Sequence, residues 1–214
     1  MKLSGTALAL GALAALALGS ADGAPPSPDR WVVDYDGHGR VVEDPAGALV
    51  LEPGRAVGCA TTHAALARMR SSVDHPVRDF RLTFRAVTDA QLRRGARPNE
   101  WEALWLFFNY TGAPDDKRTN YLAFKTNGVE IGRAWGSSTQ RFLSTGEGPG
   151  TPIGHEALIE VTKVGQRLTV TIDGALALRY DGVGDALFDE PGAIGFYTED
   201  ARVRVLWAEL QPAR

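Results

Sequence analysis

Two carboxylates stand two residues apart at the start of the most aromatic segment of the chain. Glu100 and Glu102 flank Trp101, and a run rich in Trp and Phe follows. On an extended strand, such residues point to the same face with Cα atoms roughly 6.5–7 Å apart. That separation suits paired carboxyl groups in glycoside hydrolysis, where one protonates the leaving oxygen and the other attacks or activates water. The alternative is a solvated strand end without chemistry.

The aromatic segment itself indicates a second kind of chemistry. Trp101 and Trp105 are four residues apart and share a face of an extended strand, with Asn109 further along. Indole rings stack on the apolar C–H face of a pyranose, and neighbouring amides and charges bind its hydroxyls. These residues therefore predict a sugar-binding platform, with two core tryptophans as the equally weighted alternative.

Charged and polar residues of the following segments could complete such a site. Lys125, Glu130, Arg133 and Gln140 suit a polar and even an acidic glycan, although solvated strand residues of these types are common. A polysaccharide lyase needs a proton-abstracting Tyr or His near a cation that neutralises a uronate carboxylate. Tyr121 with Lys125 matches those roles in residue type alone.

Metal-binding patterns are sparse. The four histidines are far apart and lack the short spacings of a zinc site, so no zinc and no cofactor are predicted. Hard oxygen ligands near the two ends of the chain leave a structural calcium ion open. Those ligands would be Asp34, Asp36, Glu199 and Asp200.

The elements that must position these residues have the alternation of an antiparallel sheet. Phe80, Leu82, Phe84 and Ala86 alternate with polar residues, which predicts a half-buried strand. Asn127-Gly128 and Asp173-Gly174 are strong hairpin signals because they tolerate positive φ. The segment 101–110 is apolar on both faces, so one face belongs to the core and the other lies under loops or lines a groove. About a dozen short strands without a convincing helix predict an all-β, two-sheet antiparallel jelly-roll sandwich.

Length and composition fit one such domain. The chain has 214 residues, 44% of them hydrophobic and 23% charged, which suffices for one buried core. Residues 1–23 have the positively charged start, the apolar run and the small residues of a signal peptide. A membrane anchor is the alternative, but a run of about 16 apolar residues is short for crossing a bilayer. We expect residues 24–30 to form a Pro-rich spacer and residues 31–212 a single jelly-roll domain.

Net charge and cysteine content restrict the partners and the compartment. A net charge of −3 without a basic stripe argues against a nucleic-acid partner. Cys59 is the only cysteine, so an intramolecular disulfide is impossible. The predicted location is secreted or periplasmic, with no membrane attachment once the signal peptide is cleaved, and the oligomeric state stays open.

Several segments together resemble the concanavalin A-like lectin/glucanase superfamily, in particular secreted bacterial domains similar to 3-keto-disaccharide hydrolases. The segments that carry the resemblance are 79–84, 101–109, 120–132, 172–174 and 192–201. The resemblance implies a concanavalin A-like jelly roll over residues 31–210. Members similar to laminarinases carry Glu-x-Asp-x-x-Glu on one strand, whereas here Glu100 and Glu102 are followed by Trp105, so the pattern is incomplete.

These observations favour a secreted domain that binds a polysaccharide or oligosaccharide on one sheet face. The second hypothesis is a glycoside hydrolase or polysaccharide lyase that uses the same face, with Glu100, Glu102 and Tyr121 as candidate catalytic residues. The third is a structural or protein-partner domain without a sugar site. The superfamily includes both binding modules and enzymes, so the resemblance does not choose among them.

Overall fold

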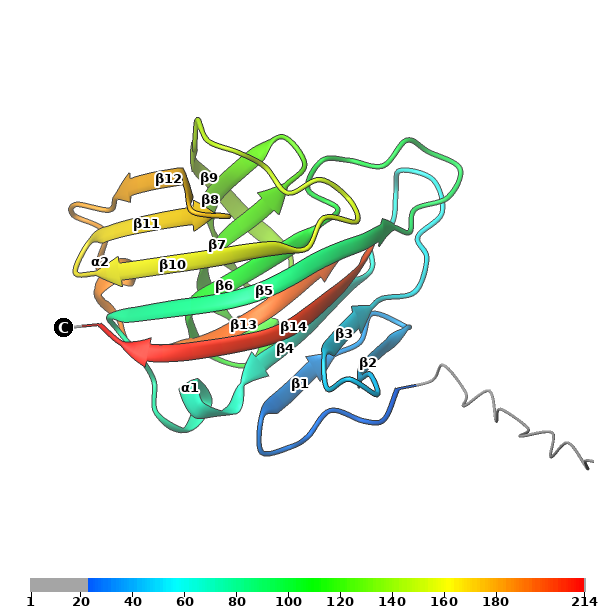
Figure 1. Ribbon diagram of the computed structural model, residues 1–214, viewed down its shortest axis with the longest axis horizontal. Helices are drawn as coiled ribbons and strands as arrows, with labels where there is room; N and C mark the ends of the chain where they lie inside the picture. The colour runs from blue at the N-terminus through cyan, green and yellow to red at the C-terminus, as the bar shows by residue number, and fades with distance from the viewer. Residues whose placement is uncertain (1–22, 214) are drawn as a thin grey trace, which may run out of the picture.

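The computed structural model describes residues 23–213, so the predicted signal peptide lies almost wholly outside the described residues. Two antiparallel sheets of seven strands each face one another (Figure 1). Sheet I has the order β1 (Trp31–Tyr35), β4 (Ala64–Met69), β13 (Ala193–Glu199), β6 (Leu104–Thr111), β7 (Arg118–Lys125), β8 (Gly128–Trp135) and β9 (Thr139–Thr145). Sheet II has the order β12 (Ala175–Asp181), β11 (Arg167–Ile172), β10 (Ala157–Val164), β5 (Phe80–Gln91), β14 (Ala201–Pro212), β3 (Leu49–Glu52) and β2 (Arg40–Glu43).

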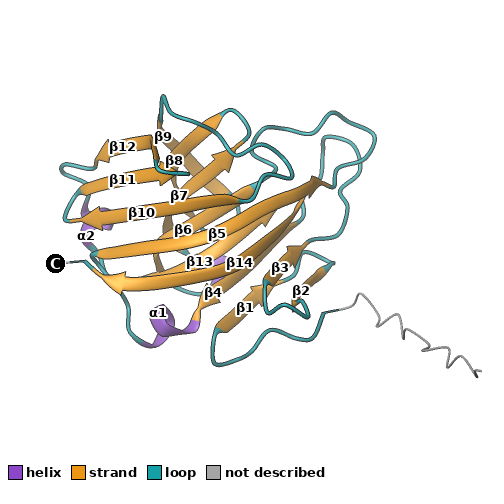
Figure 2. Ribbon diagram, in the orientation of Figure 1, coloured by secondary structure: helices purple, strands orange, loops and turns teal. Residues whose placement is uncertain are grey.

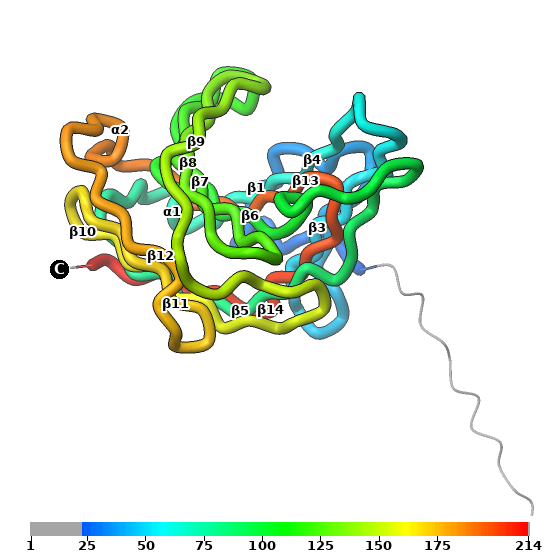
Figure 3. Tube along the Cα trace, turned by 90° about the horizontal axis from the view of Figure 1, so that it is seen from above, coloured from blue at the N-terminus to red at the C-terminus, as the bar shows by residue number. Residues whose placement is uncertain are grey.

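The strand order interleaves distant parts of the sequence. β6 to β9 and β10 to β12 run as meanders, but β13 lies between β4 and β6, and β14 lies between β3 and β5. Because β13 and β14 follow one another in the chain but belong to opposite sheets, they join the two layers seen end-on in Figure 3. This is the predicted all-β jelly-roll sandwich.

Helices are short in the part of the chain that the structure describes. They are α1 (Arg70–Asp74), α2 (Ala186–Asp189) and a 3₁₀ turn, η1 (Pro114–Asp116), which Figure 2 sets against the surrounding strands. Within residues 23–213, no helix combines the length and apolar character needed to cross a membrane.

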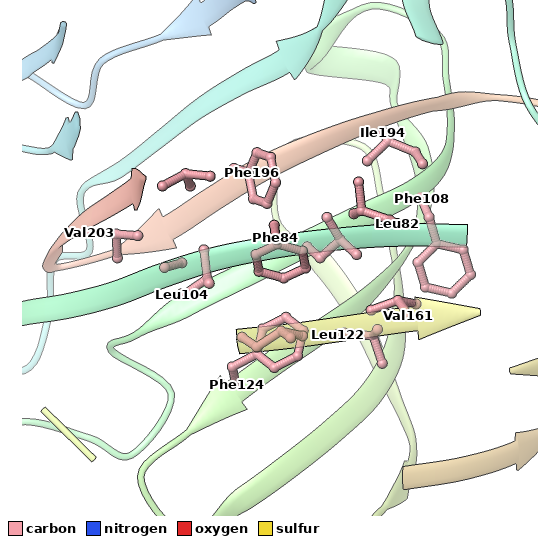
Figure 4. Close-up of a cluster of buried hydrophobic side chains, with 14 of the residues drawn as sticks. Leu82, Phe84, Leu104, Phe108, Leu122, Phe124, Val161, Ile194, Phe196 and Val203 are labelled. Atoms are coloured by element: carbon pink, nitrogen blue, oxygen red, sulfur yellow. The ribbon is translucent and has the colours of Figure 1, made fainter. Parts of the chain in front are cut away.

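Alternating residues fill the space between the sheets. On β5, Phe80, Leu82, Phe84 and Ala86 are buried, as their spacing predicts. Phe84 makes edge-on contacts with the ring of Phe124 on β7, at 5.8 Å between centroids, and with the ring of Phe196 on β13, at 5.2 Å (Figure 4). Such T-shaped pairs add to the area that burial removes from water, so this cluster holds sheet I against sheet II.

Local signals fix two of the hairpins. Asp173 and Gly174 both have positive φ, 50° and 81°, and they join β11 to β12 as predicted. The β7–β8 hairpin lies where Asn127-Gly128 predicted one, but its two turn residues are Thr126 and Asn127, because Gly128 is already in β8 and pairs with Lys125. Both turns set the register of the strands they connect.

The aromatic segment departs from its prediction at its start. The strand β6 begins at Leu104, not at Trp101, because Glu102 N donates to Asn99 O at 3.1 Å and Ala103 N donates to Trp101 O at 2.8 Å. These local hydrogen bonds close a turn over residues 99–103. The strand itself is apolar on both faces, as expected: Leu104, Leu106 and Phe108 face sheet II, and the alternate residues face outward.

Candidate functional site

The outer face of sheet I carries a cluster of aromatic side chains. β6 presents Trp105 and Phe107, β7 presents Tyr121 and β13 presents Tyr197, because directly paired residues of neighbouring strands share a face. The Trp105 and Tyr121 rings lie 4.7 Å apart between centroids, and Phe107 stacks on Tyr197 at 4.5 Å. This second cluster therefore lies on the side of sheet I that faces away from the sandwich core.

Polar groups border the cluster on β7 and β8. Tyr121 Oη donates to Glu130 Oε1 at 3.0 Å, and Lys125 Nζ lies 3.0 Å from Glu130 Oε2. Gly132 makes this arrangement possible, since a Cβ at that position would lie 2.2 Å from Tyr121 Oη. The glycine thus lets the phenol lie flat across β8 and reach the carboxylate.

A small pocket opens in this face, which we call the outer-face pocket. Its lining residues are Trp105, Phe107, Lys117, Ala134, Ser137, Ser138, Thr139, Gln140, Tyr197 and Glu199. Its volume is about 40 Å³, compared with the roughly 10–15 Å³ that one water requires. The pocket therefore admits a substituent such as a hydroxyl or hydroxymethyl group, and a larger ligand would cover its mouth.

Two connections form the rim of the pocket. Lys117 ends the β6–β7 connection, and Gly136 begins the β8–β9 turn. Lys117 Nζ donates to Gly136 O at 2.6 Å, and Gly136 N donates to Lys117 O at 2.9 Å. These hydrogen bonds hold the two connections together, so that Ser137 and Ser138 line the pocket beside the aromatic cluster.

Burial perturbs the ionisable groups of the pocket. It raises the pKa of Glu199 above its ordinary value, against the opposing effect of Tyr197, whose Oη donates to Glu199 Oε1 at 2.6 Å. Burial also lowers the pKa of Lys117, and Asp115 and Glu199 oppose that shift. A cation, a carboxyl group and a phenol therefore meet beside apolar rings, a combination that occurs at functional sites.

Five of the residues predicted to act together do lie on this face. Trp105 and Gln140 line the outer-face pocket, while Tyr121, Lys125 and Glu130 form the adjacent hydrogen-bonded group. Burial raises the pKa of Tyr121, as do the charge and hydrogen bond of Glu130. A tyrosine with a raised pKa stays protonated near neutral pH and donates a hydrogen bond, which does not fit the proton-abstracting role considered for it.

Two other predicted binding residues lie elsewhere. Asn109 is buried at a bulge with φ of 53°, and its Nδ2 donates to Glu190 O while its Oδ1 accepts from Asn120. Arg133 alternates with Glu130 and Gly132 along β8, so it points to the opposite side, where it pairs with Asp185. Neither side chain reaches the outer-face pocket.

The predicted carboxylate pair does not converge, and the expectation that both side chains share a strand face is wrong. Glu102 is fully buried, with Oε1 at 2.6 Å from Arg93 Nε. Glu100 instead accepts a hydrogen bond from Thr126. The turn over residues 99–103 replaces the extended backbone that the spacing argument required.

Trp101 lies in that turn and is 44% exposed. Its carbonyl accepts a hydrogen bond from Trp105 Nε1 at 2.7 Å. This bond ties the turn to the aromatic cluster. On the edge strand β9, Phe142 is 56% exposed and pairs with Gly132.

The acidic residues considered for calcium do not form one group. Asp34 makes a bidentate pair with Arg68, at 2.7 Å for each hydrogen bond, and Asp200 Oδ2 lies 2.5 Å from Arg93 Nη2. Asp36 Oδ1 accepts from the backbone of His38. Within residues 23–213, no three His, Cys, Asp or Glu side chains are arranged to hold a metal ion.

Sequence reasoning missed the three ionisable residues of the pocket as sugar contacts. Tyr197 and Glu199 alternate with Ile194, Phe196 and Thr198, which places both on one face of the strand. Lys117 follows a charged loop, and nothing in its spacing marks it. Only the pairing of β13 with β6, and of β7 with β8, brings these side chains together.

No protein-family model matches the sequence, and no curated protein matches it. Solved structures do match the fold. A carbohydrate-binding module from Bacillus subtilis superposes with a TM-score of 0.59 at 14% identity, over 85% of this chain and 94% of that one. A Bacillus subtilis protein of unknown function with a galectin-like fold gives 0.60 at 12% identity, over 85% and 89%. The laminarinase from Rhodothermus marinus gives 0.55 at 14% identity, over 90% and 94%.

These likenesses, together with the two-sheet architecture, confirm the antiparallel jelly-roll sandwich that the sequence indicated. At such identities they concern the fold alone, since this architecture serves binding modules and enzymes alike. The function must therefore be argued from the outer face of sheet I.

Proposed function

We propose that this chain is a carbohydrate-binding domain that holds a polysaccharide or oligosaccharide on the outer face of sheet I. The observation that carries the proposal is the outer-face pocket, where the rings of Trp105 and Tyr197 adjoin Lys117, Glu199 and Gln140. Trp105 and Tyr197 are only 3% and 8% exposed. A sugar presents both an apolar C–H face and a set of hydroxyls, so it matches the polar groups of the pocket and the small exposed parts of these rings.

The size of the pocket indicates the mode of binding. Because it holds about 40 Å³, a pyranose ring would lie across its mouth and insert one hydroxyl or hydroxymethyl group. Two exposed rings, Trp101 in the turn before β6 and Phe142 on the edge strand β9, would then contact neighbouring sugar units. Tyr121, Lys125 and Glu130 offer further donors and acceptors between them.

Two further observations support the proposal. Among the fold's relatives in structure are a carbohydrate-binding module and a laminarinase. The N-terminal 23 residues have the composition of a signal peptide, which favours a secreted or periplasmic protein with access to extracellular glycans.

Catalysis on the same face is the second candidate function, and one observation favours it. Glu199 has a pKa raised by burial and accepts a hydrogen bond from Tyr197 beside the cationic Lys117. A general acid must carry its proton at the operating pH, and a raised pKa changes a carboxyl group in that direction. A hydrolase or lyase would therefore use Glu199, in place of Glu100 and Glu102.

A glycan-array and polysaccharide screen of residues 24–214, with product analysis of each polysaccharide, tests both candidates. Binding without new reducing ends or unsaturated products supports the binding domain, whereas new products that disappear in Glu199→Gln support the enzyme. Gln140→Ala should weaken binding, while Arg141→Ala is the matched control, because adjacent residues of β9 point to opposite sides. Absence of both binding and products would overturn the proposal and favour a structural or protein-partner domain.

A further inference from the structure

A second pocket lies on the other side of β8, and we call it the α2 pocket. Its lining residues are Arg118, Arg133, Ala134, Trp135, Ala186, Leu187 and Glu190. Its volume is about 310 Å³, which falls at the lower end of the range of small-ligand sites, about 300–1,000 Å³. Apart from Ala134, it shares no lining residue with the outer-face pocket.

Strand pairing gathers arginines on this side of sheet I. Arg118 of β7 pairs with Trp135 of β8, and Arg133 pairs with Arg141 of β9. Paired residues share a face, and Arg133 and Trp135 are two apart on one strand, so all four point to the same side. The pocket therefore has an exposed indole among guanidinium groups, with Trp135 39% exposed.

The guanidinium groups of this side are incompletely satisfied. Arg133 pairs with Asp185 through Nη2, but its buried Nε has no hydrogen-bond partner. Among the described residues, Arg118 and Arg141 take part in no hydrogen bond or ion pair of their side chains. Burial lowers the pKa of Arg133, and the charge of Arg141 contributes to the same shift. An added anion would relieve this repulsion.

The remaining lining residues restrict the chemistry of that anion. Trp135, Ala186 and Leu187 form an apolar wall, which suits a ring. Glu190 also lines the pocket, and a carboxylate there repels a bare anion but accepts hydrogen bonds from hydroxyl groups. A ligand that carries a carboxylate at one end and hydroxyls at the other fits both features, whereas a phosphate or an aromatic acid satisfies only one.

We propose that the α2 pocket binds a carboxylate-bearing sugar, such as a uronate unit of an acidic polysaccharide. The guanidinium groups of Arg118 and Arg133 hold the carboxylate, because a planar guanidinium matches carboxylate geometry. The ring of Trp135 covers the C–H face of the sugar, and Glu190 accepts from its hydroxyls. This site goes beyond the proposed function, since it is a separate pocket with its own ligand class.

The test is a titration of ¹⁵N-labelled residues 24–214 with trimers of galacturonate, mannuronate, guluronate and glucuronate. The same trimers with their carboxyl groups reduced serve as neutral controls. We expect at least one charged trimer to move the Trp135 indole N–H resonance, and its reduced form to leave that resonance in place. Affinity should fall about tenfold or more in Trp135→Ala and in Arg118→Ala, and it should weaken as salt screens the charges.

Trp207→Ala is the matched control, since Trp207 on β14 is a comparably exposed tryptophan that lines neither the α2 pocket nor the outer-face pocket. It should bind the charged trimer as the parent does. Equal binding of charged and reduced trimers, no binding of any trimer, or binding that survives both pocket variants would overturn the proposal. Charged trimers that move Gln140 instead of Trp135 would also overturn it, and in that case the proposed function on the outer face would stand.

Discussion

Arg93 is the centre of a buried charge cluster that we expect to control the stability of the domain. Its guanidinium contacts two carboxylates, with Nε at 2.6 Å from Glu102 Oε1 and Nη2 at 2.5 Å from Asp200 Oδ2. Only 3% of the Arg93 side chain is exposed, and neither carboxylate side chain is exposed at all. Nη1 also donates to the carbonyls of Gly58 and Thr61, at 2.7 and 2.9 Å.

Replacing Arg93 by Met keeps much of the volume but removes the only cation that contacts these two carboxylates in the described part of the chain. Breaking a buried ion pair from one side costs about 3–5 kcal/mol, because the remaining charge stays buried without compensation. With a urea m-value of about 2 kcal/mol/M, the unfolding midpoint should fall by about 1.5–2.5 M. Such a loss is a large part of the roughly 5–15 kcal/mol that stabilises a typical domain.

Urea unfolding followed by tryptophan fluorescence at pH 7 measures this loss. The control is Arg81→Met, because Arg81 pairs with Glu160 at 3.1 Å and their side chains are 56% and 36% exposed. Exposed pairs contribute about 0–1 kcal/mol. The deficit of Arg93→Met should also shrink toward pH 4, because burial raises the pKa of Asp200 and protonation of its carboxylate removes an uncompensated charge. A loss no larger than that of Arg81→Met, or one independent of pH, would refute the reasoning.

Two further predictions concern the outer face. Burial raises the pKa of Glu199 in the folded protein above that of an unfolded glutamate, which is about 4.3. The proton on Glu199 therefore stabilises the fold fully at pH values below about 4.3. This stabilisation is lost as the pH rises through the pKa of the folded state. Glu199→Gln should therefore gain stability relative to the parent between pH 4 and pH 8 in paired urea titrations; a constant difference would contradict the shift. Gly132→Ala places a Cβ against the Tyr121 phenol, so we expect a loss of about 1–3 kcal/mol and weaker glycan binding. Thr169→Ala is the control, because Thr169 on β11 lines neither pocket. Unchanged stability and binding would contradict the close packing of Tyr121.

Local sequence signals determined the sheets and several turns. The alternation from Phe80 to Ala86 predicted a strand with one buried face, because side chains of a strand point to opposite sides in turn. Asp173-Gly174 predicted a hairpin because both residues adopt positive φ readily. The apolar character of both faces from Leu104 to Phe108 predicted a covered central strand. Each signal depends on neighbours within a few residues, which the sequence displays directly.

The site depended on contacts that local patterns do not contain. Glu100 and Glu102 looked like a pair only if the backbone was extended, and the hydrogen bonds of a turn, together with Arg93, separated them. Glu199 and Lys117 gave no signal of proximity, because the register of the strands that carry them decides what each side chain faces. Local patterns therefore predict an all-β sandwich with an aromatic central strand. They do not predict which polar groups that strand meets, because pairing between distant strands depends on the packing of the whole core.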